Sequence, residues 1–379
     1  MRKILPILLL SILASCGEKG NSEKAESKNI LENLTYSVDT VVVDSGDELI
    51  NLKFGLGWFD RSADGKSLFL YDSDRSLFQE IDLEQMTLKE NFLFEKEGPN
   101  GTGRVNSFQL QSDRSILIPS FQNPGIFNLQ GEQIRTFNLK PNDLKGAESI
   151  NGFAILTKML WNPNTEKLYS LPGDVTTGKF EFAITNPKSQ TVQILPLANM
   201  EKSQNFRVTQ LEGDGAAAFT EVYDLTKFKD NFIISCTSGS GIYFYNTSID
   251  SLRHMDFPHK LIPMEKSGEI KNDVSSSQEW YEEYRKVVGQ ISYWRMNWDE
   301  ATSRFYRLAS RSLLGEKRED PAKYEVYLLV YDEKLNLLGE SRLEGYNDFP
   351  RSYFFKDGKL WSYVNVEDEL GFAVFTFDF

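Results

Sequence analysis

A strand-forming unit recurs along most of the sequence, and this repeat constrains the fold more than any other feature. Its clearest copy runs from Asn106 to Leu139 and holds four apolar segments separated by polar turns. The second of these segments occurs six times, each time after a charged turn, in residues 64–71, 113–120, 165–172, 229–236, 302–309 and 356–363. A four-stranded unit of roughly 40–50 residues is typical of a β-propeller blade. The sequence therefore predicts an all-β fold with six blades.

The third strand of each unit provides a second mark of the repeat. It ends in an apolar residue followed by Asp or Asn, at Ile81-Asp82, Phe127-Asn128, Tyr245-Asn246, Tyr331-Asp332 and Phe377-Asp378, with a looser copy at 183–186. The wider gaps between these marks indicate insertions between blades, which we place at 196–218 and 258–290.

The first strand of the repeat region can supply the strand that the last unit lacks. The last unit stops at Phe379 on its third strand, whereas residues 35–43 form a lone strand with no unit of their own. Placing this strand as the missing outer strand closes the ring and removes an exposed sheet edge. The alternatives are a large β-sandwich, a two-domain β protein and a seven-bladed ring that uses residues 258–290.

The second insertion contains one convincing helix, near 276–291. Ser276 and Glu279 fit a capping box, in which the serine accepts an amide hydrogen bond and the glutamate reaches back. Trp280, Tyr284 and Val287 then share one helical face. We expect this aromatic stripe to pack on the rim of the propeller, with a groove on a partner as the alternative.

Aromatic residues make up 13% of the chain, and blade packing accounts for most of them. Trp58, Trp161 and Trp298 precede the turn of three different units. This recurrence predicts that all three pack between blades, in preference to a role in stacking on sugars.

The amino terminus has the pattern of an export signal. Arg2 and Lys3 precede an apolar run, residues 4–14, that is too short to span a bilayer. The residues that follow, Leu13-Ala14-Ser15-Cys16, resemble the lipobox of bacterial lipoproteins, where the cysteine is lipidated. We therefore expect a signal peptide at 1–15, lipidation of Cys16, a flexible acidic tether at 16–33 and the propeller domain at 34–379. The predicted location is the cell envelope, with the lipid in the outer membrane and the domain periplasmic or surface-exposed.

Charge and composition exclude several classes of function. A net charge of −13 argues against nucleic-acid binding, because neutralising phosphates needs a basic surface. Two His and two Cys cannot build a three-His or four-Cys zinc site, so we expect no metal and no cofactor. No G-x-S-x-G nucleophile motif occurs, and we predict no catalytic residues. A carboxylate pair for glycoside cleavage stays open, because such a pair need not be close in sequence.

Basic residues recur where we expect inner strands to begin, at Lys53, Arg104, Arg295 and Arg351. If all four face the mouth of the central channel, they form a positive ring suited to carboxylate or phosphate groups. The alternative is that they form salt bridges with nearby acidic loop residues.

The lipobox at Cys16, the acidic tether, the glycine-rich loop Gly98–Gly103 and the six units together resemble an uncharacterised family of Bacteroidetes lipoproteins. Its members contain a domain of unknown function with a TolB-like six-bladed β-propeller. The resemblance implies an envelope lipoprotein with no established activity. In such propellers the glycine-rich loop is a tight turn into an inner strand.

Two functions fit these observations. The first is a lipid-anchored envelope propeller that attaches to the membrane through its lipid and binds or scaffolds a protein or glycan partner. The second is a propeller enzyme that acts on polysaccharide through carboxylates, as a lyase or a hydrolase. The scarcity of His and the missing nucleophile motif favour the first.

Overall fold

The computed structural model describes residues 28–379, except 151, 212–216 and 316–319. The predicted signal peptide, Cys16 and most of the predicted tether lie outside the described residues. From Asn29 onward the chain is tied to the domain, because Ile30 N donates to Leu338 O at 3.0 Å and the Leu31 side chain is fully buried.

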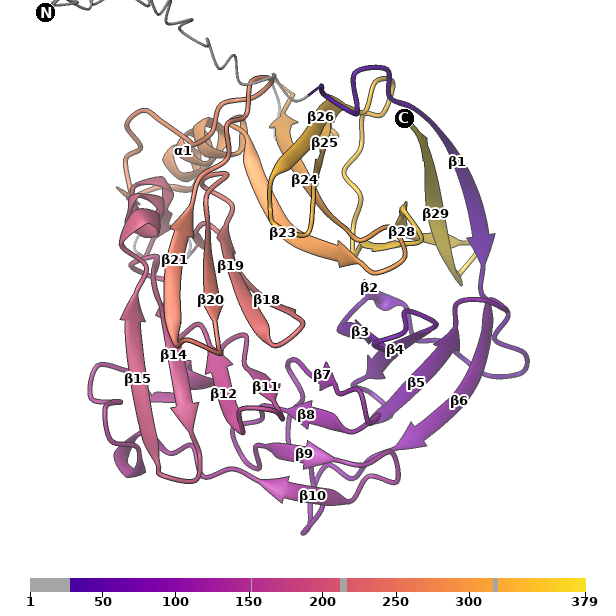
Figure 1. The fold of residues 1–379 in the computed structure, drawn as a ribbon, viewed down its shortest axis with the longest axis vertical. Coiled ribbons are helices and arrows are strands. Elements are labelled where there is room, and N and C mark those ends of the chain that lie inside the picture. The colour runs from indigo at the N-terminus through magenta and orange to yellow at the C-terminus, as the bar shows by residue number, and fades with distance from the viewer. Residues whose placement is uncertain (1–27, 151, 212–216, 316–319) are drawn as a thin grey trace, which may run out of the picture.

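Six sheets surround a central axis, which confirms the predicted six-bladed propeller (Figure 1). The first blade contains β3 (Phe59–Arg61), β4 (Ser67–Asp72), β5 (Leu77–Asp82) and β6 (Thr87–Leu93). The second contains β7 (Gln109–Leu110), β8 (Ile116–Ile118), β9 (Gly125–Phe127) and β10 (Gln133–Thr136). The third contains β11 (Leu160–Asn162), β12 (Lys167–Ser170), β14 (Lys179–Asn186) and β15 (Thr191–Pro196), with the short β13 (Gly173–Asp174) paired to β14.

The remaining blades follow the same antiparallel order. The fourth contains β18 (Tyr223–Phe228), β19 (Asn231–Cys236), β20 (Ile242–Asn246) and β21 (Ser251–Met255). The fifth contains β23 (Ser292–Asp299), β24 (Arg304–Leu313), β25 (Lys323–Tyr331) and β26 (Leu337–Arg342). The sixth contains β27 (Phe354–Lys356), β28 (Lys359–Val366), β29 (Glu369–Asp378) and β1 (Thr35–Val42). A further short strand, β2 (Lys53–Leu56), precedes the first blade.

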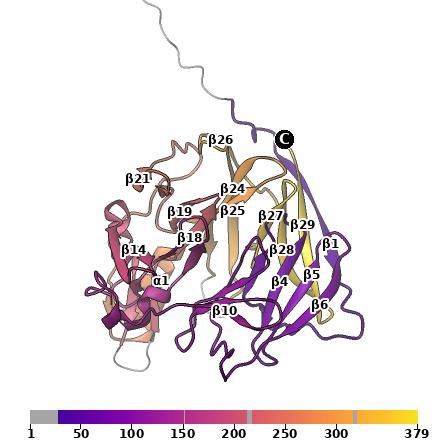
Figure 2. The ribbon, with the colours of Figure 1, turned by 60° about the horizontal axis from the view of Figure 1, so that its bottom comes forward.

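The ring closes through its amino-terminal strand, as the sequence predicts. β1 pairs antiparallel with β29 in unbroken register, from Thr35 opposite Asp378 to Val42 opposite Gly371. The strand covers an edge of the last sheet that would otherwise expose unpaired backbone groups. Figure 2 shows β28, β29 and β1 beside β4, β5 and β6 of the first blade. An apolar cluster that includes Leu68, Ile81 and Phe372 fills the space between these two blades.

The two insertions pair with each other into a small added unit. β16 (Val208–Gln210) lies between β17 (Ala217–Phe219) and β22 (Asp273–Val274), and it pairs in parallel with β22. The described residues also form three short 3₁₀ helices, η1 (Pro141–Asp143), η2 (Gly152–Leu156) and η3 (Ala198–Phe206). The pairing of the two insertions could not be predicted from the sequence. The parallel pairing of β16 with β22 covers only two residues of each strand, which is too short to produce a recognisable alternation of apolar and polar residues.

The predicted helix is α1 (Ser277–Val288). Ser276 caps it, accepting a hydrogen bond from Glu279 N at 3.2 Å, whereas the Glu279 carboxylate accepts from Ser275 N at 3.1 Å. The aromatic stripe packs on the small sheet, which corrects the expectation that it lies on the propeller rim. Trp280 Nε1 donates to Val208 O at 3.1 Å, in the middle strand of that sheet.

A polar clamp joins the first two blades. Glu80, on β5, is fully buried and accepts hydrogen bonds at both carboxylate oxygens from the Arg114 guanidinium, at 3.0 and 2.7 Å. Ser67 Oγ and Lys89 Nζ complete its partners at 2.7 and 3.1 Å. Burial alone would raise the pKa of Glu80, but the hydrogen bonds from Arg114, Ser67 and Lys89 outweigh it and lower the pKa to about 2.

Candidate functional site

A cavity of about 1040 Å³ opens between the first and second blades. Four segments line it: residues 51–58 between β1 and β3, 71–73 at the end of β4, 96–106 between β6 and β7, and 122–123 between β8 and β9. These segments are the loops that follow outer strands and the loops that join second to third strands. The cavity is large enough for a ligand of several rings, since pockets for small molecules measure roughly 300–1,000 Å³.

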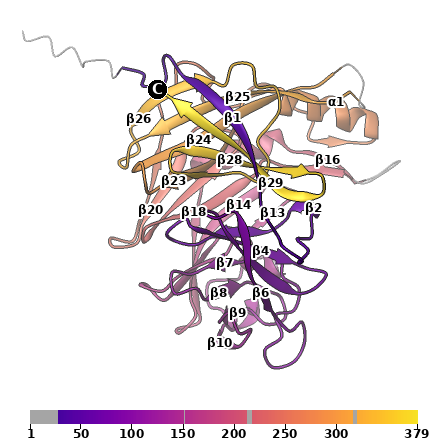
Figure 3. The same cartoon turned by 90° about the vertical axis from the view of Figure 1, so that its right-hand side faces the viewer.

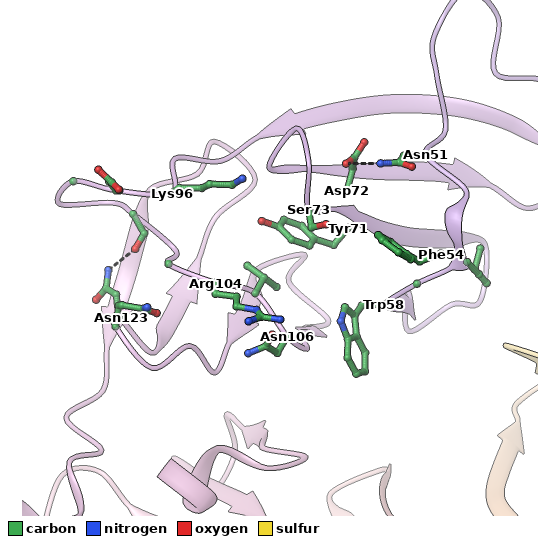
Figure 4. A pocket seen from close by; sticks show the side chains of 18 of the residues that line it. Asn51, Phe54, Trp58, Tyr71, Asp72, Ser73, Lys96, Arg104, Asn106 and Asn123 are labelled. Atoms are coloured by element: carbon green, nitrogen blue, oxygen red, sulfur yellow. Dashed lines mark hydrogen bonds between the residues drawn. The ribbon is translucent and has the colours of Figure 1, made fainter. Parts of the chain in front are cut away.

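One wall of the cavity presents aromatic rings to solvent. Phe54 is 78% exposed and Trp58 is 55% exposed, and both line the pocket (Figure 4). Gly55 and Gly57 flank Leu56 with positive φ angles of 73° and 65°. These left-handed positions bend the segment between the two rings, which a β-branched residue would resist. Leu56 is buried, and this anchors the segment while its aromatic neighbours stay at the surface.

The exposure of Trp58 corrects the prediction that all three tryptophans pack between blades. Trp161 is 3% exposed, and the Trp298 ring lies 4.8 Å from both Phe228 and Phe305, so those two do pack as predicted. Strand register explains the difference. Trp161 pairs with the second residue of β12, and Trp298 pairs with the second residue of β24. In the first blade Arg61 holds that position, and Trp58 lies three residues earlier, before β3 begins.

The glycine-rich loop forms the opposite wall and is internally braced. Thr102 N donates to Glu95 O at 2.8 Å, and Gly103 N donates to Lys96 O at 3.0 Å. Asn123 Nδ2 donates to Gly101 O at 2.9 Å, which ties the loop to the second blade. A Cβ at Gly101 would lie 2.6 Å from a backbone carbon of the same loop, so only glycine fits there. The turn predicted from sequence is therefore also a wall of the pocket.

Polar side chains surround the aromatic wall. Asn51, Asn106, Gln122 and Asn123 supply amides. Asp72 is buried and bound by Arg75 Nε at 2.6 Å and by Asn51 Nδ2 at 3.2 Å.

The environment of Asp72 decides its protonation state. Burial alone would raise the pKa of this carboxyl, but hydrogen bonds from the Arg75 side chain and backbone and from Asn51 hold the pKa below its usual value. Asp72 therefore stays ionised near neutral pH and, together with Asp74, accepts hydrogen bonds from the Asn51 amide.

The four basic residues selected from sequence lie in different surroundings. Arg104 lines the pocket. Lys53 begins β2, outside the blade sheets, with Nζ 5.1 Å from the centre of the Phe54 ring. Arg295 lies within inner strand β23 and donates to Tyr353 O at 3.0 Å. Arg351 is exposed and precedes β27. The structure thus brings only Arg104 of the four into the cavity.

Arg295 has a basic neighbour on the first blade. Burial and the charge of Arg295 lower the pKa of Arg61 to about 10. Arg61 Nη1 donates to Phe355 O at 2.7 Å, so this side chain joins the first and last blades.

Sequence reasoning missed most of the pocket. Phe54, Asn51, Asn106 and Gln122 carried no motif, and they come together only because the ring places four loops side by side. The one available signal was Phe54-Gly55-Leu56-Gly57, where two glycines flank an apolar residue without strand alternation.

Both histidines lie close to other side chains of the protein. The side chain of His259 is fully buried, with Nδ1 2.9 Å from Glu340 Oε2 and Nε2 3.3 Å from the Tyr331 hydroxyl. His254 Nδ1 lies 3.5 Å from Asp256 Oδ2. Within residues 28–379, apart from the short gaps, no three His, Cys, Asp or Glu side chains are grouped as metal ligands.

Comparison with known proteins places the chain in a family. In the part of the chain that the structure describes, no helix has the length and apolar character needed to cross a membrane. No curated protein sequence matches the chain. A crystal structure of a DUF4221 family member from Bacteroides vulgatus aligns with a TM-score of 0.62 and 16% identity, covering 91% of this chain and 98% of that one. A candidate exported protein from Bacteroides fragilis aligns with a TM-score of 0.48 and 11% identity, over 92% and 96% of the two chains. The family model for DUF4221, a domain of unknown function, matches residues 27–342, and the chain therefore belongs to this family.

Proposed function

We propose that this protein is a lipid-anchored binding module of the cell envelope and that the pocket between its first two blades binds a glycan. The observation that carries the proposal is the exposed pair Phe54 and Trp58, which line the same cavity as the amide side chains of Asn106 and Gln122. Aromatic rings of this kind are costly to leave in water, and they stack well on the C–H faces of sugars. Amides bind hydroxyl groups as donors and as acceptors, so they complement the rest of a sugar ring.

The surroundings of Asp72 favour binding over catalysis at this site. A glycoside-cleaving pair needs one carboxyl whose raised pKa keeps it protonated near neutral pH. The pKa of Asp72 is held below its usual value, and its carboxylate forms a salt bridge with the Arg75 side chain. This carboxyl is therefore unsuited to the role of general acid.

Glycan binding is tested by screening the purified chain on an array of neutral and acidic glycans, followed by calorimetry on the best ligand. Phe54→Ala and Trp58→Ala should each weaken binding about 3- to 10-fold, taking about 0.5–1.5 kcal/mol for an aromatic contact. Phe379→Ala is the matched control, because Phe379 is also exposed, at 41%, but lies outside the pocket. Equal affinity of all three variants would refute the assignment of the pocket.

Lipid anchoring requires its own test, because it rests on Cys16 and the residues before it. The full-length chain expressed in a Gram-negative host should incorporate radiolabelled palmitate and sediment with membranes. Cys16→Ala should abolish both. Membrane association of the Cys16→Ala chain without label would show that the anchor is not a lipid on this residue.

A further inference from the structure

Two cations enter the same pocket from the glycine-rich loop. Lys96 and Arg104 both line the cavity, and both side chains are exposed. Figure 4 shows them extending from the loop toward the part of the pocket that holds Tyr71 and Trp58. The hydrogen bond from Gly103 N to Lys96 O holds the two legs of the loop together, so the backbone of Lys96 lies next to that of Arg104.

These two cations lack acidic partners. Carboxylates outnumber basic side chains 55 to 42 in the sequence, and ion pairs neutralise many of the other bases. Across the described residues, no side-chain hydrogen bond or ion pair involves Lys96 Nζ or the Arg104 guanidinium. The pocket is therefore a local positive site on an acidic protein.

The acidic groups of the pocket do not cancel this charge. Two carboxylates line the cavity, those of Asp72 and Glu97. Asp72 already pairs with Arg75 at 2.6 Å. Glu97 offers one negative charge against the two positive charges of Lys96 and Arg104, which leaves an excess of positive charge facing the cavity.

We propose that the pocket selects a negatively charged glycan, with Lys96 and Arg104 binding a carboxylate or sulfate group while Trp58 and Phe54 stack on sugar rings. This inference rests on the proposed glycan function and names its ligand class. A planar guanidinium binds such oxyanions through two parallel hydrogen bonds, and a nearby ammonium adds a second charge-assisted contact. The braced loop holds both groups in place before the ligand arrives, which reduces the entropic cost of binding.

The test uses two pairs of probes that differ only in charge: polygalacturonate with its carboxyl-reduced form, and dextran sulfate with dextran. We expect the purified chain to bind at least one charged member at least 10-fold more tightly than its neutral counterpart. The pair that shows the preference identifies the anion as carboxylate or sulfate. The overall negative charge of the protein repels both polyanions, so a preference for the charged form reports the local site.

Substitutions of Lys96 and Arg104 then test whether these two residues cause the preference for the charged probe. Lys96→Gln and Arg104→Gln should each weaken binding of the charged probe about 10-fold, the loss of one charge-assisted hydrogen bond, and should weaken binding of the neutral counterpart less. Lys188→Gln is the matched control, since Lys188 is exposed in the turn between β14 and β15. Loss of binding only in the two pocket variants supports the proposal.

Two outcomes separate this inference from the proposed function. If charged and neutral probes bind equally and Trp58→Ala weakens both, the pocket binds glycans without charge selection and the inference is wrong. If neither the probes nor the glycan array shows binding that depends on Trp58, the glycan function itself is wrong.

Discussion

The clamp between Glu80 and Arg114 should make the joint between the first two blades sensitive to acid. We consider Glu80→Gln, which keeps the shape of the side chain and removes its charge. A pKa lowered from 4.5 to about 2 corresponds to about 3 kcal/mol of stability at neutral pH. The side chains of Arg114 and Lys89 are 42% and 50% exposed, so solvent weakens their attraction to Glu80. We therefore expect Glu80→Gln to lower the free energy of unfolding at neutral pH by about 1–2 kcal/mol.

The pH dependence gives the sharper test. Because folding lowers the pKa of Glu80, its stabilisation is complete at pH values above the unfolded pKa, near 4.5, and is lost as the pH falls toward 2. The difference in unfolding free energy between wild type and Glu80→Gln should be constant from pH 7 to pH 5.5. It should shrink by about half at pH 3, because Glu80 in the unfolded chain takes up a proton below about pH 4.5 whereas Glu80 in the folded clamp stays ionised down to about pH 2.

Urea denaturation followed by tryptophan fluorescence measures this difference at each pH. Glu166→Gln is the control, because Glu166 forms a surface pair with Arg135 in which both side chains are largely exposed, and it should behave as wild type. A Glu80→Gln protein as stable as wild type at pH 7, or a difference that does not change with pH, would refute the reasoning.

Three further predictions follow from single positions. Burial raises the pKa of the Cys236 thiol to about 11, so in a chain that starts at Lys28 a thiol reagent at pH 8 should react only after urea is added. Gly103→Ala should lower glycan affinity without unfolding the chain, because φ at this position is 64° and a Cβ would lie 2.5 Å from Gln122 Oε1. Unchanged affinity would show that the loop does not shape the pocket. Glu340→Gln should speed amide exchange at Lys260, whose N–H now donates to the carboxylate at 2.6 Å, and unchanged exchange would contradict this role.

The number of blades and their closure could be predicted because both depend on local pattern. Each second strand follows a charged turn, and five of the six third strands end in an apolar residue followed by Asp or Asn, so the repeat can be recognised from the sequence without knowledge of any contact. Closure by residues 35–43 followed from counting strands, and the register of β1 against β29 confirms it.

The pocket could not be predicted in the same way. Its walls come from four loops, and their proximity depends on how neighbouring blades are rotated about the axis. The burial of Trp58 was misjudged because the sequence pattern placed it beside a turn, whereas strand pairing places Arg61 at the packed position. Of the four bases chosen from the sequence, only Arg104 lines this pocket, and the other basic residue in its lining is Lys96.

The direction of β1 has a consequence for how the protein meets its surroundings. The strand begins beside Asp378, near the carboxyl terminus, and the chain that leaves it leads into β2 and the aromatic wall. Figure 3 shows these two ends on opposite sides of the ring, with β2 and α1 on the side away from the carboxyl terminus. β1 is eight residues long and spans about 26 Å between them. The residues around β2, which line the pocket, therefore lie on the side of the ring opposite to the one where β1 begins.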